Sequence, residues 1–232
     1  MTKPSPDHLE GGDDEVARPS LIIFDLDGTL ADSQAGVLHS FALTLGDVGR
    51  SASDEELRDL IGPPLSESFA RLGFEGDDID DAVTRYRAYY DRDGVDMSHL
   101  YDGTLAMLRT LHDNGIELAV ATSKRVDFAR RMLRNLGIED FFPVICGAAL
   151  DGTVNTKSDV LEETLGLVSR HPPREIWMVG DRREDVLAAI FHSLIPVGAL
   201  WGYGGPSELE ESGAEILVAV SSDLLRIPLL NL

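Results

Sequence analysis

The chain has 232 residues, of which 43% are hydrophobic, and its formal net charge is −21 at pH 7. That length suits one large domain or a core domain with a smaller insertion, and the composition is that of a folded globular protein. The strong negative charge argues against nucleic-acid and anionic-membrane partners, because both are bound by basic surfaces.

The N-terminal segment, residues 1–19, is polar, acidic and rich in Pro and Gly, so we interpret it as a disordered acidic tail. It has no apolar signal-peptide core, and no later stretch reaches the length of a membrane span. The single Cys146 lies in an apolar run and has no disulfide partner in the chain, which suits a buried free thiol in a reducing compartment. We therefore expect a cytoplasmic protein.

The first predicted strand is the apolar run at the start of "SLIIFDLDGTLADS", residues 20–33. An apolar run bounded by a glycine is typical of a buried parallel strand. Side chains alternate along a strand, so Asp25 and Asp27 should project towards a common region where this strand ends. Two crowded carboxylates repel each other and resist burial, so their placement indicates a chemical role.

Residues 34–99 are predicted to be helical throughout. One helix is N-capped by Ser53 and closes on Gly62, a second begins at a proline, and a third has apolar spacing near 3.6 and ends on Gly94. Because this segment separates the first strand from all later strands, we expect it to form an inserted all-helical cap domain with four or five helices.

From Tyr101 onwards strands and helices alternate. We expect helices at 104–114, at 126–136, from residue 157 and at 184–192, and strands at 117–121, 143–146, 175–179, 196–201 and 215–220. Alternation of this kind predicts an α/β fold with a three-layer, Rossmann-like parallel sheet core covered by helices on both faces. Residues 20–33 and 100–232 should form that core, and 34–99 the cap.

Polar side chains follow the predicted strands at the edge where open parallel sheets bind ligands. Asp25, Asp27 and Thr29 follow the first strand. Other strands and helices bring Thr122, Ser123, Lys157, Asp181 and Asp185 to the same edge. The sequence thus collects carboxylates, hydroxyls and one lysine at one place.

Simpler interpretations exist for several of these residues. The first aspartates could begin a calcium loop, but the sixth and twelfth positions of such a loop are Leu30 and Gly36 where glycine and glutamate are required. Asp181 could be a helix N-cap whose capping box is completed by Glu184, and the two hydroxyls after the second strand could also be caps.

Lys157 resists a simple interpretation. Thr156 should cap its helix, which puts a cation in the first turn, where the helix dipole disfavours it. The chain contains only Lys3, Lys124 and Lys157, so a lysine at this position is not explained by a high lysine content. An anion at this edge of the sheet would explain the placement.

Four sequence segments, "FDLDGTLADS", "VATSK", "NTKSDV" and "MVGDRREDV", resemble in order the four motifs of the haloacid dehalogenase-like (HAD) superfamily. The resemblance runs from about residue 20 to residue 220. The helical segment after the first motif, "IGPPL" and the late "WGYG" resemble the phosphoglycolate-phosphatase and 5′-nucleotidase branch. One departure is His192–Ser193, where the family often has a small residue and glycine.

The resemblance implies a role for each matching residue. Asp25 would be the nucleophile that forms an aspartyl-phosphate, Asp27 the acid and then the base, and Lys157 the cation that offsets charge and steadies Asp25. Thr122 would hold phosphoryl oxygens. Substrate contacts are further implied for Gly28, Thr29 and Ser123. Mg²⁺ is the implied cofactor, with ligands from Asp25, the backbone carbonyl of Asp27, and Asp181, and with Asp185 orienting its water shell.

The resulting prediction is a Mg²⁺-dependent phosphatase for a small phosphorylated metabolite, such as phosphoglycolate, a nucleoside monophosphate or a sugar phosphate. A phosphomutase of the β-phosphoglucomutase type and a non-catalytic binding protein on the same fold are the alternatives. Asp27 disfavours a dehalogenase, and the lysine-free cap disfavours a phosphonatase. Cap arginines at 58, 71 and 87 are candidates for holding an anionic leaving group. The substrate and the oligomeric state stay open.

Overall fold

A computed structural model describes residues 18–149, 154 and 156–227. Its centre is a six-stranded parallel sheet with the strand order β5-β4-β1-β6-β7-β8. The strands of this sheet are β1 (Leu21–Phe24), β4 (Glu117–Arg125), β5 (Val144–Ala148), β6 (Ile176–Gly180), β7 (Ile195–Ala199) and β8 (Ile216–Val218). The predicted α/β fold class is confirmed. Most of the predicted tail lies outside the described residues.

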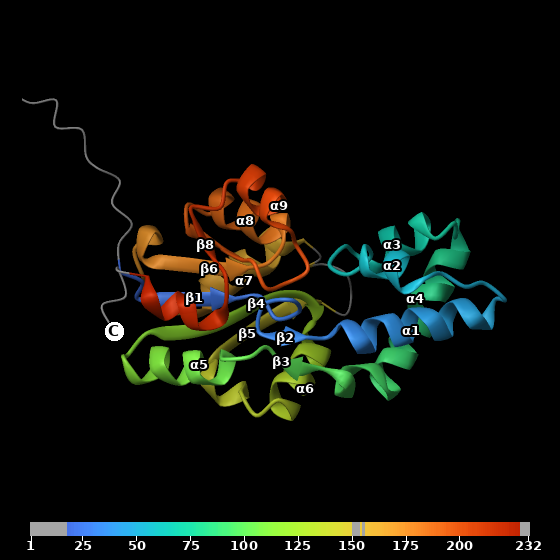
Figure 1. Ribbon diagram of the computed structural model, residues 1–232, viewed down its shortest axis with the longest axis horizontal. Helices are drawn as coiled ribbons and strands as arrows, with labels where there is room; N and C mark the ends of the chain where they lie inside the picture. The colour runs from blue at the N-terminus through green and yellow to red at the C-terminus, as the bar shows by residue number, and fades with distance from the viewer. Residues whose placement is uncertain (1–17, 150–153, 155, 228–232) are drawn as a thin grey trace, which may run out of the picture.

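Helices cover both faces of the sheet (Figure 1). They are α5 (Thr104–Asp113), α6 (Val126–Asn135), α7 (Lys157–Leu167), α8 (Arg183–Phe191) and α9 (Pro206–Ser212), with short 3-10 turns η2 (Glu139–Phe141), η3 (Pro173–Glu175) and η4 (Ser221–Arg226). Alternation along β1 decides which face each side chain serves. Ile22 and Phe24 join the hydrophobic cluster under α5 and α6, whereas Leu21 and Ile23 join the one under α7 and α8.

The segment between the first two motifs forms the helices α1 (Gln34–Asp47), α2 (Asp54–Arg58), α3 (Leu65–Arg71), α4 (Asp77–Arg92) and η1 (Gly94–Met97). We call residues 34–99 the helical insert. It projects from the core at the carboxyl end of β1 (Figure 1). Phe41, Phe69 and Tyr86 form its aromatic centre, with Phe41 ring centroids 5.3 Å from Phe69 and 4.7 Å from Tyr86.

The helical insert joins the core at a short antiparallel ladder. Strand β2 (Ala31–Asp32) pairs with β3 (His99–Leu100), so the chain leaves and re-enters the core side by side. One boundary in the insert differs from prediction. The helix capped by Ser53 has the expected capping box with Glu56, but it ends at Arg58, well before Gly62, because a turn follows at once.

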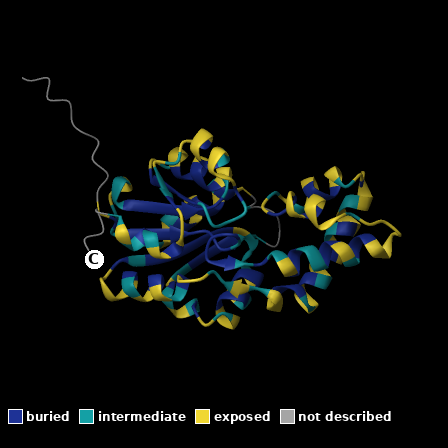
Figure 2. Cartoon of the chain, viewed as in Figure 1, coloured by how far each residue is buried: buried dark blue, intermediate teal, exposed yellow. Residues whose placement is uncertain are grey.

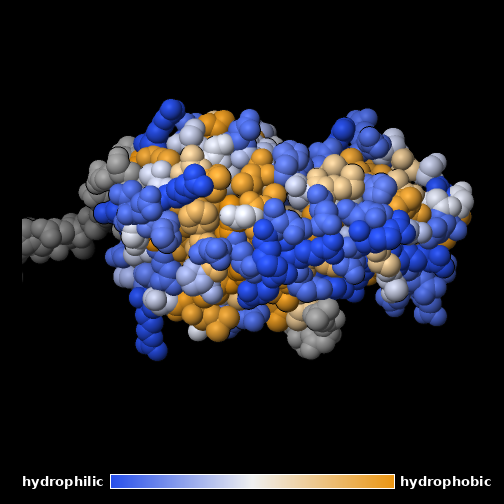
Figure 3. Space-filling model, turned by 90° about the horizontal axis from the view of Figure 1, so that it is seen from below, coloured by the Kyte–Doolittle hydropathy of each residue, from blue (hydrophilic) through white to orange (hydrophobic). Residues whose placement is uncertain are grey.

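Burial follows this layering (Figure 2). The strands are buried, and exposed residues lie on the outer surfaces of the helices. Figure 3 looks onto the face that α5 and α6 cover, and mostly hydrophilic residues appear there with hydrophobic ones among them. Cys146 is a buried free thiol, as predicted. None of the helices in the described ranges combines the length and hydrophobicity that crossing a membrane requires.

Ser193 provides a test of the local backbone. It follows α8 with φ of 60°, in the left-handed region that favours glycine, and Leu194 donates its N–H to the Ala189 carbonyl at 2.8 Å. We expect Ser193→Gly to raise the free energy of unfolding by about 1 kcal/mol, since the strain removed exceeds the entropy that glycine adds to the unfolded chain. Urea denaturation at neutral pH measures this difference.

Gly137 is the matched control, because it ends α6 in the same way with φ of 70° and has open space around its Cα. Gly137→Ser should lower the free energy of unfolding by a similar amount. A stability loss in Ser193→Gly would contradict the strain assigned to that position.

Candidate active site

The predicted site residues meet at the carboxyl ends of β1, β4 and β6. Asp25 directly follows β1, Thr122 lies in β4, and Asp181 directly follows β6. These strands are neighbours in the sheet, so side chains more than 150 positions apart in sequence come into contact. Lys157 arrives at the same edge as the first residue of α7, whose N-cap is Thr156, as predicted.

Lys157 binds two of the carboxylates. Its Nζ lies 2.6 Å from Oδ1 of Asp25 and 2.8 Å from Oδ1 of Asp185, and it also donates to the Ala121 carbonyl at 3.0 Å. Burial opposes the charge of Lys157, but the two carboxylates outweigh it and raise the pKa of this lysine above its ordinary value. The lysine therefore stays positively charged inside the protein.

Asp181 is fully buried and held by donors on both oxygens. Thr29 Oγ1 donates to Oδ1 at 2.9 Å, and the backbone N–H of Tyr203 donates to Oδ2 at 2.8 Å. Two glycines make room for this carboxylate. A Cβ on Gly28 or on Gly202 would come within 2.2 Å of Asp181 atoms. The chain around Asp181 is thus built to hold a carboxylate at this point.

The cluster holds three buried carboxylates, of which two contact Lys157. Oxygens of Asp25, Asp181 and Asp185 lie within 4.8 Å of one another. Burial and the neighbouring carboxylates raise the pKa of Asp181 well above its ordinary value, and burial raises that of Asp185 to about 6 although Lys157 opposes this. Clustered carboxylates with excess negative charge are the oxygen ligands that Mg²⁺ prefers, so the residues fit a divalent cation.

Asp27 lies apart from this cluster and has its own partners. Ser33 Oγ donates to Oδ1 in a short hydrogen bond, and Lys124 Nζ lies 3.0 Å from Oδ2. Lys124 also donates to the Tyr90 hydroxyl of α4 at 2.8 Å. Burial opposes the charge of Lys124, but Asp27 and Tyr90 raise its pKa above the ordinary value. Each aspartate of the first motif therefore has its own lysine.

A bulge in β4 sets the position of Lys124. Thr122 pairs with Gly147 and Arg125 with Ala148, so two residues of β4 have no opposite residue on β5. Bulges of this kind redirect a side chain and are common beside active sites. Gly147 makes the bulge possible, because a Cβ there would come within 2.5 Å of the Lys124 carbonyl oxygen. Nothing in the sequence pattern marks this irregularity.

The remaining predicted residues lie as follows. Thr122 is buried, and its hydroxyl accepts a hydrogen bond from the backbone of Lys124 at 3.2 Å. Ser123 is exposed at the end of β4, and Gly28 donates its N–H to the Ala31 carbonyl at 2.9 Å. The N-cap interpretation of Asp181 is wrong. Arg182 is the N-cap residue of α8, and its N–H bonds to Asp185 at 3.1 Å, so Asp181 stays available to the site.

Lys124, Ser33, Tyr90 and Tyr203 were not among the predicted site residues. Lys124 had a signal in the sequence, because the scarcity of lysine that singled out Lys157 applies equally to it. Tyr203 lies in the "WGYG" segment, and its hydroxyl accepts the Ser33 N–H at 2.9 Å and donates to Asp32 at 3.1 Å. The cap arginines at 58, 71 and 87 are exposed side chains in this structure.

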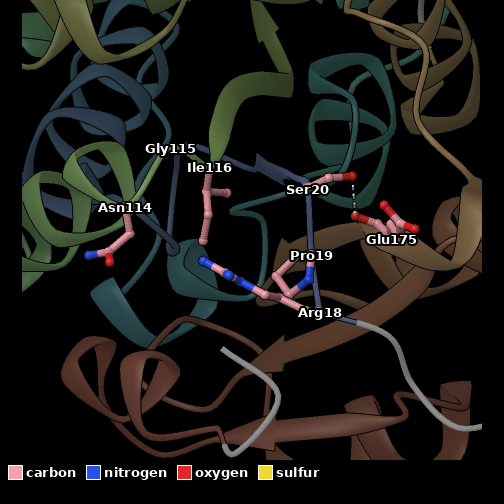
Figure 4. A pocket seen from close by; sticks show the side chains of 7 residues that line it. All are labelled: Arg18, Pro19, Ser20, Asn114, Gly115, Ile116 and Glu175. Carbon is pink, nitrogen blue, oxygen red and sulfur yellow. Dashed lines mark hydrogen bonds between the residues drawn. The ribbon is translucent and has the colours of Figure 1, made fainter. Parts of the chain in front are cut away.

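A hollow at the opposite edge of the sheet contains none of the predicted site residues (Figure 4). Its lining includes Arg18, Ser20, Asn114, Ile116 and Glu175, which lie before the first residues of β1, β4 and β6. Ligands of open parallel sheets bind at the carboxyl ends of the strands instead. The candidate site is therefore the cluster around Asp25.

Residues 22–192 match the family model described as haloacid dehalogenase-like hydrolase. The chain belongs to this hydrolase family. The match covers all four motifs that the sequence brought together, and it confirms the predicted family and the prediction of an enzyme.

Individual relatives are similar to this chain over most of its length. The tyrosine-protein kinase PtkA of Mycobacterium tuberculosis is 40% identical over 210 residues, which are 90% of this chain and 72% of the relative. A 5′-nucleotidase of Pseudomonas aeruginosa is 34% identical over 201 residues, covering 84% and 89% of the two chains. A haloacid dehalogenase-like family hydrolase of Streptococcus pneumoniae has a TM-score of 0.83 at 30% identity, covering 89% of this chain and 98% of its own.

The carboxylate cluster predicts that Mg²⁺ stabilises the fold. At pH 7.5, Mg²⁺ at about 100 times its Kd should add about 2.7 kcal/mol to the free energy of unfolding, because the ion binds only the folded state. Asp181→Asn should lose most of this gain, and Asp140→Asn, an exposed change outside the cluster, should keep it. Thermal unfolding with Mg²⁺ and with chelator measures both.

The gain should shrink at pH 5. With the pKa of Asp185 raised from 3.8 to about 6, the folded protein without metal holds more protons than the unfolded chain between these values. Its stability therefore falls as the pH rises through this interval, and the fully ionised cluster that a divalent cation would bind forms above it. An equal gain at both pH values would contradict the cluster as the metal site.

Proposed function

We propose that this HAD hydrolase is a Mg²⁺-dependent phosphatase that removes a phosphoryl group from a small phosphomonoester through an aspartyl-phosphate on Asp25. The observation that carries the proposal is the arrangement of the two aspartates of the first motif. Asp25 lies with Lys157 beside the excess carboxylates, and Asp27 lies apart with Lys124 as its own counter-charge. Two carboxylates in different environments suit a nucleophile and an acid–base group.

The proposed reaction has two displacements at phosphorus. Oδ of Asp25 forms a bond to phosphorus while the bond to the leaving oxygen breaks, and Asp27, which enters this step protonated, gives its proton to that oxygen. Asp27 then accepts a proton from water, whose oxygen attacks the aspartyl-phosphate and releases orthophosphate and free Asp25. Lys157 offsets the negative charge that develops beside Asp25. Thr122, buried at the end of β4, is placed to hold a phosphoryl oxygen.

A divalent cation held by Asp25, Asp181, the Asp27 carbonyl and, through its waters, Asp185 would lower the repulsion between the nucleophile and the phosphate dianion. The proposal assigns this ion to Mg²⁺. The helical insert stands over the carboxyl end of β1, so the proposed substrates are small metabolites, such as phosphoglycolate, nucleoside monophosphates or sugar phosphates. We propose no nucleic-acid or membrane partner and a cytoplasmic location, in view of the net charge of −21 and the free thiol.

Substitution of each aspartate tests the assignment. Asp25→Asn should abolish turnover and form no phosphoenzyme, because the amide is a poor nucleophile. Asp27→Asn should slow turnover by about 10²- to 10⁴-fold, yet accumulate phosphoenzyme from p-nitrophenyl phosphate, because water attack has lost its base. Steady-state assays with acid-quench trapping of labelled protein measure both. Near-normal turnover in Asp25→Asn would refute the proposed nucleophile.

A second candidate function rests on the relative named tyrosine-protein kinase, which matches 90% of this chain at 40% identity. The same aspartate could accept the γ-phosphoryl group of ATP, release ADP, and pass the group to a tyrosine hydroxyl in place of water. The first half of this reaction needs no group beyond those of the phosphatase. The two functions differ in the phosphoryl donor, which is ATP for the kinase, and in the final acceptor.

An acceptor assay separates the candidates. With Mg²⁺ and γ-labelled ATP, a phosphatase should leave a tyrosine-containing peptide unlabelled, and any label that it removes from ATP should appear as orthophosphate. We expect a panel of small phosphomonoesters to include at least one with a higher kcat/KM than p-nitrophenyl phosphate. Stable transfer of label to tyrosine would favour the kinase, and isomerisation of a sugar phosphate without release would favour the phosphomutase.

A further inference from the structure

The proposed reaction leaves one buried cation without a role. The chain has three lysines, and both of those in the described residues lie in the site. Lys157 serves the nucleophile. Lys124, with a side chain only 9% exposed, is paired with Asp27. Burying a lysine costs free energy that an apolar side chain at the same place would not. Its position therefore needs a reason beyond packing.

Asp27 is fixed through both of its carboxylate oxygens. Ser33 Oγ binds Oδ1, and Lys124 Nζ binds Oδ2 at 3.0 Å. The terminal torsion of an aspartate is broad, so a carboxylate with one partner can still turn. Two partners from different parts of the chain fix the plane of the group. Proton transfer depends on this kind of alignment, because an error of about 1 Å is costly.

Lys124 is itself fixed by the helical insert. Lysine has a flexible stem, so its ammonium group needs further contacts to stay in place. Tyr90 supplies two, because its hydroxyl lies 2.8 Å from Nζ and its ring centroid lies 4.4 Å from the same atom. Tyr90 is locked in turn between Tyr86 of the insert, at 5.9 Å, and Phe128 of the core helix α6, at 5.4 Å.

These contacts form a chain from the insert to the acid–base group. Tyr90 belongs to α4, and Lys124 belongs to the bulge of β4. Movement of α4 away from α6 would remove the partner of Lys124 and release one oxygen of Asp27. We propose that Lys124 is a positioning residue that aligns Asp27 for proton transfer, and that Tyr90 makes this alignment depend on a docked helical insert. The inference rests on the proposed acid–base role of Asp27.

Leaving-group dependence provides the test. Phenyl phosphate and p-nitrophenyl phosphate are similar in size, but phenolate is the stronger base and needs the proton more. Lys124→Met keeps the length of the side chain and removes its charge. It should lower kcat/KM for phenyl phosphate at least about tenfold more than for p-nitrophenyl phosphate. In the double variant with Asp27→Asn, Lys124→Met should lower kcat/KM by less than about twofold relative to Asp27→Asn alone, because both changes remove the same function.

Three further variants complete the experiment. Lys124→Arg keeps a cation and should restore part of the activity on phenyl phosphate. Tyr90→Leu should show the same selective loss as Lys124→Met, and Tyr90→Phe, which keeps the ring contact, a smaller one. Thermal unfolding identifies any variant that does not fold, and in that case Lys124→Arg and Tyr90→Phe carry the test.

The outcomes separate the inference from the function beneath it. Equal losses on both substrates in Lys124→Met, or losses that multiply with those of Asp27→Asn, would overturn the positioning role. Wild-type leaving-group dependence in both Tyr90 variants would overturn the link to the insert. If Asp27→Asn loses no more kcat/KM on phenyl phosphate than on p-nitrophenyl phosphate, Asp27 is not the acid. That result would refute the proposed function, whatever the Lys124 and Tyr90 variants show.

Discussion

An imbalance of buried charge is the constraint on which this structure depends. Asp25, Asp181 and Asp185 stand within a few ångströms of one another around a single lysine. In a medium of low dielectric constant such an excess of negative charge is costly, and the surrounding chain supplies groups that stabilise it. Backbone N–H groups, a threonine hydroxyl and close-approaching glycines all turn towards these carboxylates. A net negative charge remains at this edge of the sheet, which a divalent cation would balance.

The two aspartates of the first motif differ because of that imbalance. Their positions two residues apart place Asp25 where positive charge is short and Asp27 where Lys124 balances it. Each carboxylate meets a different lysine, because Lys157 comes from the start of α7 and Lys124 from the bulge of β4. One short segment thereby supplies two carboxylates with different surroundings, which is how a protein gives the same chemical group two roles.

Much of this site was accessible from the sequence, for physical reasons. Parallel strands share one ligand-binding edge, so Asp25, Thr122 and Asp181 could be brought together from strand ends alone. Lys157 stood out because a cation in a first helical turn is unfavourable. Other features depend on contacts that no local pattern encodes. Sequence favoured Asp181 as the N-cap, because aspartate is a common N-cap residue, but α8 begins one residue later with Arg182 in that place.

The limits are clearest for Lys124 and Tyr90. The lysine was rare enough to be noticed, but its direction depends on a bulge that no residue type announces and that a glycine on the neighbouring strand permits. In the sequence, Tyr90 is one of several apolar positions with helical spacing. Only the docking of that helix against α6 gives its hydroxyl a second purpose. Tertiary contact, rather than periodicity, decides such roles.

The ladder between β2 and β3 has a consequence for how the protein is divided. Because Asp32 and His99 are paired neighbours, a chain that omitted everything between them could turn directly from one to the other without disturbing the order of the main sheet. The insert thus leaves and re-enters the core at one place, and the strand order of the main sheet does not depend on it. Away from this ladder the insert also contacts the core, through Tyr90 with Lys124, Asp91 with Arg131, and the Ile61 carbonyl with Arg182.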